Sequence, residues 1–340
     1  MAIFWIWSRF TWYATYYDNQ DVVFRISYLL IVFPILGIVN NVDAILNQDY
    51  RMATYWYIAL EVVLLFLWGR VLFRTHRFRA NSQSFFVSYS IGLALVVLSL
   101  FVPANAQYVC WGLAILSEMI GPVIGWHRCR GKLPVHTSHI IERHGLFTII
   151  LLGEGVVSVS SNFTQVTDLG AGLTLALAYL LVVALWWIYF DYGFGFATKL
   201  SKNPTNTFVF GYGQFLVFAA IALSTISLEY GLHRALAQSQ LPSEEHFSWA
   251  ALLPISSGTF LLSLGFVQWL VSEENPRNIY ALRFVIGVGL VVLPWVIALS
   301  FSASLLVSTL PLTLVGGNDT YWWGRGKRSE RKRKPSSHCF

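Results

Sequence analysis

Apolar residues run along the chain in stretches of the roughly 20 residues that a helix needs to cross a bilayer. The stretches lie near residues 24–42, 55–73, 84–102, 108–126, 140–160, 169–190, 207–228, 249–271 and 283–310. Backbone groups in hydrocarbon must form their hydrogen bonds within the segment, so each stretch is expected to be a helix. The pattern predicts an all-α, polytopic transmembrane helical bundle of about nine spans.

Composition supports the same class. The chain has 340 residues, of which 56% are hydrophobic and 12% are charged, whereas about 25% of a soluble domain is charged. The connections between the apolar stretches are short, so we expect one transmembrane helical domain at 1–315 and a basic, disordered tail at 316–340. We therefore expect an integral membrane protein that crosses the membrane several times. Its first expected partner is the lipid bilayer.

Basic residues gather in alternate loops: Arg70, Arg74, Arg77, Arg79, Arg128, Arg130, Lys132, Lys199 and Lys202. The positive-inside rule predicts that these loops are cytoplasmic. Nine spans would then leave the basic tail outside, which conflicts with the same rule. The segment 283–310 is interrupted by Pro294, so we expect it to be split or re-entrant. The other possibility is an external tail, in which the Asn318-Asp319-Thr320 sequon is accessible.

The tail itself has one candidate binding function. A basic cluster beside a membrane attracts anionic lipid by about 1 kcal/mol per residue. The alternative is a solvated end without a ligand. Nothing folded accompanies the basic run, so nucleic acid is not an expected partner. The candidate lipid-binding residues are Lys327, Arg328, Arg331, Lys332, Arg333 and Lys334.

Charged residues within the apolar stretches are the candidate functional residues. A charge at the centre of a spanning helix costs about 2.5–3.5 kcal/mol, so it needs a partner or a use. The predicted ion or substrate pathway consists of Glu154, Arg143, Glu142, His144, Glu61 and Glu118. The spacing predicts that Arg143, Phe147, Ile150, Glu154 and Ser158 form one stripe facing the bundle interior. The alternative is a structural hydrogen-bond network.

Other chemistry receives little support from the sequence. His136 and His139 stand three residues apart before Glu142, but this spacing matches no strong metal motif and leaves them weak candidates. Phosphate-loop and nucleophile-elbow motifs do not occur, so neither an enzyme nor a cofactor is favoured. Aromatic clusters, such as Trp5, Trp12 and Tyr13, are expected to form interfacial belts.

Several motifs resemble those of the low temperature requirement A (LtrA) family. Glu142-Arg143-His144-Gly145-Leu146-Phe147, followed by Leu152-Gly153-Glu154, is similar to the family's signature. The early Trp12-Tyr13 with Asp21 and Arg25, and the later segment 185–191, agree with it, so the similarity covers roughly residues 5–300. The family's opening helix is expected to be missing, and Gln214 stands where we associate a histidine with the family. The resemblance implies a multi-pass membrane protein and supplies no reaction.

Two functional hypotheses follow. In the first, the bundle moves protons, ions or a small solute through a carboxylate-lined interior. In the second, the chain is a non-transporting scaffold or lipid-responsive protein, in which buried charges fix the register of the helices. The sequence indicates neither the solute nor the oligomeric state.

Overall fold

The computed structural model describes residues 2–17, 21–74, 79–129, 137–193, 204–236, 249–271 and 277–333. Throughout these ranges the regular structure is helical, without a strand. Ten of the described helices are long and apolar enough to cross a membrane. The all-α polytopic bundle is therefore confirmed, with ten spans in the described ranges in place of about nine.

The tenth span comes from the segment 283–310, which is two helices. Helix α12 is Arg277–Val296 and helix α13 is Phe301–Arg333. Pro294 lies in the last turn of α12, where its missing amide hydrogen weakens the continuation of the helix. Both helices extend beyond the predicted apolar stretch, and Arg283 of α12 pairs with Asp319 of α13. The expectation of a split segment is confirmed.

Two compact units make up the chain, Ala2–His136 and Thr137–Phe340. The sequence predicted a single helical domain, because the polar connections between the spans are short. Every site described below lies within one unit.

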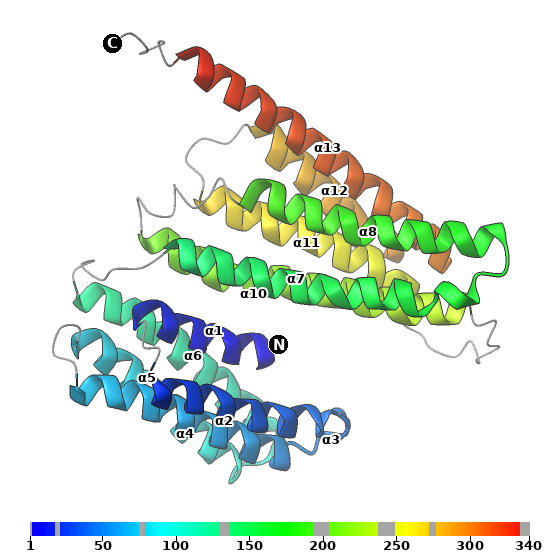
Figure 1. Cartoon of the computed structure of the whole chain (residues 1–340). Helices are drawn as coiled ribbons and strands as arrows, with labels where there is room; N and C mark the ends of the chain where they lie inside the picture. The colour runs from blue at the N-terminus through cyan, green and yellow to red at the C-terminus, as the bar shows by residue number, and fades with distance from the viewer. Residues whose placement is uncertain are drawn as a thin grey trace. The chain divides into compact units, whose positions relative to one another are not determined.

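The N-terminal unit contains α1 to α6, with bounds Ala2–Tyr16, Val22–Val39, Val42–Leu46, Arg51–Arg74, Arg79–Ser99 and Ala104–Arg128. Helix α2 packs on α4, α4 on α5, and α5 on α6 (Figure 1). The last pair approaches most closely at Gly121 and Gly125, where an added Cβ would collide with Ser88 and Asn81 of α5. These glycines therefore serve helix packing.

Helix α1 fills the interior of this unit with large side chains. Trp5, Trp12 and Tyr13 are all buried, and the ring of Tyr13 meets that of Trp68 on α4 edge to face at 5.3 Å. The predicted interfacial belt is thus wrong for these three residues. Burial is favoured because each ring removes a large apolar area from contact with water or lipid headgroups.

The C-terminal unit contains α7, η1, α8, α10, α11, α12 and α13, of which the first five are Thr137–Ser161, Phe163–Gln165, Leu169–Gly193, Pro204–Leu236 and Trp249–Val271. Helix α7 packs on α8 and α10, α10 on α11, and α11 on α12 (Figure 1). Helix α13 packs against α8 and α11.

The predicted boundary of the tail differs from the structure. Helix α13 continues through Gly316 as far as Arg333, and Asp319 within the sequon is buried. The Nδ2 atom of Asn318, to which a glycan would be attached, is also buried. Among the predicted lipid-binding residues, those from Lys327 to Arg333 have a helical backbone but their side chains are not described, and Lys334 lies outside the described residues.

Candidate functional site

Two of the predicted carboxylates meet at one arginine inside the N-terminal unit. Arg9 of α1 donates to both carboxylate oxygens of Glu61 on α4, with Nη2 2.5 Å from Oε2. Its Nη1 also lies 3.1 Å from Oε2 of Glu118 on α6. All three side chains are at most 2% exposed. Three helices therefore contribute one charged group each to a single buried cluster, which we call the Arg9 cluster.

Aromatic side chains enclose the Arg9 cluster. The indole Nε1 of Trp5 donates to Glu118 Oε2 at 2.6 Å, and Arg9 Nη1 donates to the Tyr57 hydroxyl at 3.3 Å. The guanidinium carbon lies 4.2 Å from the centre of the Tyr89 ring, a cation–π distance. These contacts fix the guanidinium in one orientation.

The positive and negative charges of the cluster do not balance, because two carboxylates share one guanidinium. The Oε1 atom of Glu118 has no hydrogen-bond partner among the described residues. It lies against Gly92 of α5, where an added Cβ would collide with it. A buried carboxylate oxygen without a donor is costly unless the group takes up a proton or a cation. The cluster therefore has the composition of a site that exchanges a positive charge.

A cavity of about 230 Å³ in the same unit reaches Tyr57. Its other walls include Ile38, Ile45, Gln107 and Trp111, from α2, α3 and α6. Tyr57 thus has its ring at the cavity and its hydroxyl on Arg9. Tyr50, in the connection between α3 and α4, also lines the cavity.

Sequence reasoning missed Arg9. It is the single charged residue in the aromatic segment 2–17, and a lone arginine in an apolar helix requires a buried partner. That signal was present, but the segment is shorter than a span and was interpreted as an interfacial belt. Glu61 and Glu118 were predicted to converge with other carboxylates, and the structure brings these two together.

Glu154 does not lie on the buried face of α7. Both Glu154 and Ile150 are exposed, so the predicted interior stripe is wrong for them. The buried face instead contains His144, Thr148 and Leu152. It is set by the contacts of α7 with α8 and α10, which the helical period alone does not reveal.

The remaining residues of the signature have separate places. His144 is buried, its Nδ1 lies 2.7 Å from the Ile140 carbonyl oxygen, and its ring faces Phe218. Glu142 is exposed, whereas Arg143 is half-buried and donates from Nε to His139 at 3.3 Å. His136 lies outside the described residues. Within the described ranges, no three His, Cys, Asp or Glu residues are close enough to hold a metal ion.

A second buried ion pair lies in the C-terminal unit. Arg283 of α12 donates from Nε to Asp319 Oδ2 of α13 at 3.2 Å, and from Nη1 to the side-chain oxygen of Gln268 on α11. The next residue of α13, Thr320, donates to Asp191 of α8 at 2.7 Å. This polar network joins four helices.

One ion pair lies at the edge of a span. Asp21 caps α2 by accepting from the Phe24 amide at 2.8 Å, and it accepts from Arg70 Nη1 at 3.0 Å. The hydrogen bond from Arg70 is the main reason that the pKa of Asp21 falls from 3.8 to about 2. The pair therefore keeps its charges at any physiological pH.

Comparison with known proteins gives a relative and a family. The chain is 26% identical over 251 residues to an uncharacterized protein of Rhizobium meliloti (strain 1021), covering 68% of this chain and 60% of the relative. The chain thus matches less than two thirds of that relative's length. No solved structure matches. The sequence profile described as bacterial low temperature requirement A protein matches residues 1–316. The integral membrane protein described above therefore belongs to the LtrA family.

Proposed function

We propose that the N-terminal unit conducts protons across the membrane, with the Arg9 cluster as the site that takes up and releases each proton. The observation that carries this proposal is the sharing of one guanidinium by two buried carboxylates. With both carboxylates ionised the cluster has one negative charge in excess. A single proton on Glu118 Oε1, the oxygen without a hydrogen-bond partner among the described residues, removes that excess.

A proton fits the cluster better than a metal cation. Hard cations such as calcium require about six to eight oxygen ligands. Around Glu118 the neighbouring groups are instead the Trp5 indole, the Arg9 guanidinium and the backbone at Gly92. Two of these are donors, which repel a metal ion. One carboxylate oxygen is sufficient for a proton.

The cavity beside Tyr57 supplies the entrance in this proposal. The Tyr57 hydroxyl accepts from Arg9, which contacts both carboxylates, so it is placed to pass a proton from the cavity to the cluster. Release toward the opposite side requires a rearrangement of α1 against α4 and α6. Arg9 and Trp5 of α1 contact Glu61 of α4 and Glu118 of α6, so in this proposal protonation of Glu118 weakens contacts of α1 and is coupled to its movement.

The test is proton flux into liposomes that contain the purified chain, driven by a potassium diffusion potential. The Glu118→Gln variant keeps an acceptor for the Trp5 indole but cannot exchange a proton. We expect its flux to fall to that of protein-free liposomes. Wild-type flux in folded Glu118→Gln would contradict the proposal.

Two further variants serve as comparisons. Glu229→Gln removes an exposed carboxylate at the end of a span and should leave the flux unchanged. Glu154→Gln tests the residue that the sequence favoured. Loss of flux in Glu154→Gln alone would place the pathway in the C-terminal unit. Thermal unfolding of each variant in detergent confirms that the proteins compared are folded.

The scaffold hypothesis has one observation in its favour. Helix α1 has 15 residues, which is short for a span, and the Arg9 cluster joins it to α4 and α6. A triple variant with Arg9→Met, Glu61→Leu and Glu118→Leu would replace the charges by apolar groups of similar size. A folded triple variant, together with a wild type that shows no flux, would support a cluster that only fixes helix register.

A further inference from the structure

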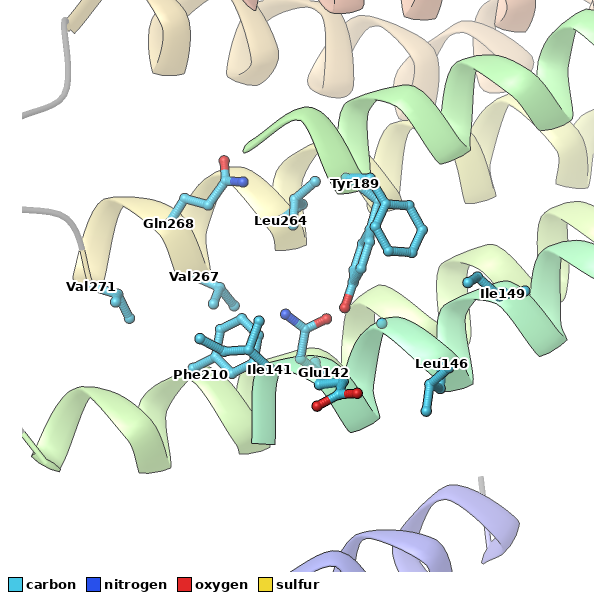
Figure 2. Close-up of a pocket in the computed structure, with 13 residues that line it drawn as sticks. Ile141, Glu142, Leu146, Ile149, Tyr189, Phe210, Leu264, Val267, Gln268 and Val271 are labelled. Carbon is cyan, nitrogen blue, oxygen red and sulfur yellow. The ribbon is translucent and has the colours of Figure 1, made fainter. Parts of the chain in front are cut away.

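A cavity of about 160 Å³ lies within the C-terminal unit, between α7, α8, α10 and α11. Figure 2 shows its labelled side chains, with Val267 on α11 directed toward Ile141 on α7. Most of its walls are apolar. An engineered apolar cavity of about 150 Å³ in another protein binds benzene, so this volume fits a ligand with one aromatic ring or a short alkyl chain.

A buried amide oxygen marks one wall of the cavity. Gln214 of α10 is 1% exposed, and its Oε1 accepts no hydrogen bond from the described residues. An amide oxygen kept from water without a donor costs about 1–3 kcal/mol. A ligand that brings an N–H or O–H group to this oxygen removes that cost. The amide is therefore the recognition group of the cavity.

Two other polar side chains limit the charge of the ligand. Glu142 on α7 is the acidic residue of the lining, and its side chain is exposed. The ring of Tyr189 extends from α8 toward α7, with its hydroxyl at the far end (Figure 2). Gln268 also lines the cavity, but its oxygen accepts from Arg283. No Lys or Arg is among the residues that line the cavity.

We propose that this cavity binds a small amphipathic amine, in its ammonium form, with an apolar ring or chain. The apolar group occupies the space between Ile141, Leu264 and Val267. The ammonium donates to the Gln214 side-chain oxygen and is attracted by the Glu142 carboxylate. An anion of the same size is repelled by the Glu142 carboxylate and finds no Lys or Arg among the lining residues, so it is rejected. The proposal goes beyond proton conduction and concerns the other unit, so the outcome of either leaves the other unaffected.

The experiment uses the purified full chain in detergent and three fluorinated probes of equal ring size: 4-fluorobenzylamine, 4-fluorobenzoate and 4-fluorotoluene. Fluorine NMR titrations give the dissociation constant of each. Gln214→Met removes the acceptor with little change in volume, and Glu142→Gln removes the acidic charge of the lining. Glu154→Gln is the matched control, because it removes an exposed carboxylate from the same helix that does not line the cavity.

We expect the amine to bind more tightly than fluorotoluene, and the benzoate to bind most weakly. Gln214→Met should weaken binding of the amine about tenfold, since a hydrogen bond to a charged donor is lost, while fluorotoluene binds as before. Glu142→Gln should weaken it about two- to fivefold, and Glu154→Gln should have no effect.

Three results would overturn the proposal: no binding of the amine, benzoate binding as tight as that of the amine, or full amine affinity in both Gln214→Met and Glu142→Gln. If Gln214→Met also fails to bind fluorotoluene, the cavity of this variant is no longer intact. In that case the proposal is tested by Glu142→Gln alone, because its side chain is exposed and its replacement leaves the cavity intact. Weaker binding of the amine with unchanged binding of fluorotoluene then supports the proposal, and unchanged binding of both overturns it.

Discussion

At the scale of single residues, Arg9 forms ion pairs with two buried carboxylates, Glu61 and Glu118. In the described part of the unit, neither carboxylate has another ion pair. Removing one partner of a buried ion pair leaves an uncompensated charge, which costs about 3–5 kcal/mol. Arg9→Met should therefore lower the free energy of unfolding by about that amount. The measurement is denaturant unfolding in mixed micelles.

The companion variant for Arg9→Met carries Glu61→Gln and Glu118→Gln in addition. Neutral amides no longer require a guanidinium, so we expect the triple variant to regain part of the lost stability. Equal instability of the single and triple variants would show that Arg9 acts through its packing against the Tyr89 ring and not through its charge.

At the scale of elements, α13 depends on one buried carboxylate. Asp319 joins α13 to Arg283 of α12, and Thr320 joins it to Asp191 of α8. Asp319→Leu removes the carboxylate that accepts from the buried Arg283, while the neutral Gln268 still accepts from it. We expect faster hydrogen exchange of the backbone amides of α13 between residues 305 and 321 in this variant, and unchanged exchange in α7.

Leu314→Ala is the control for Asp319→Leu, because it changes an exposed residue on the same helix. Its exchange should match the wild type. Exchange in α13 that does not respond to Asp319→Leu would mean that apolar packing against α8 and α11 is sufficient to hold the helix.

At the scale of the whole molecule, ten spans return the basic tail to the side of the basic loops. This topology agrees with the positive-inside rule for the basic loops named above and for the tail. We expect Ser300→Cys, between α12 and α13, to react with an impermeant maleimide in intact cells. Ser138→Cys, at the start of α7, should react only after lysis. Both residues are exposed, and the background lacks the three native cysteines.

Labelling of both engineered cysteines in intact cells, or of neither, would contradict this topology. Reversed labelling would show that the basic loops face outward. A fluorescent protein that folds only in the cytoplasm, fused after Phe340, gives an independent measurement of the side on which the tail lies. We expect this fusion to fluoresce.

The length of each apolar stretch, read from the sequence, predicted nearly every span, because the thickness of a bilayer sets the length of a helix independently of its neighbours. Pro294 also marked the place where the last stretch divides. The resemblance of the segment 142–154 to the LtrA signature identified the family. These properties are local, and a local pattern is sufficient to determine them.

The partners of the charged residues were decided by the tertiary structure alone. The sequence indicated that Glu61, Glu118 and Glu154 each needed a partner, but the partner lies on another helix. Packing placed Arg9 between the first two and left Glu154 exposed on α7. Which face of a helix is buried depends on which helices pack against it, and in a uniformly apolar span no amphipathic pattern records that choice.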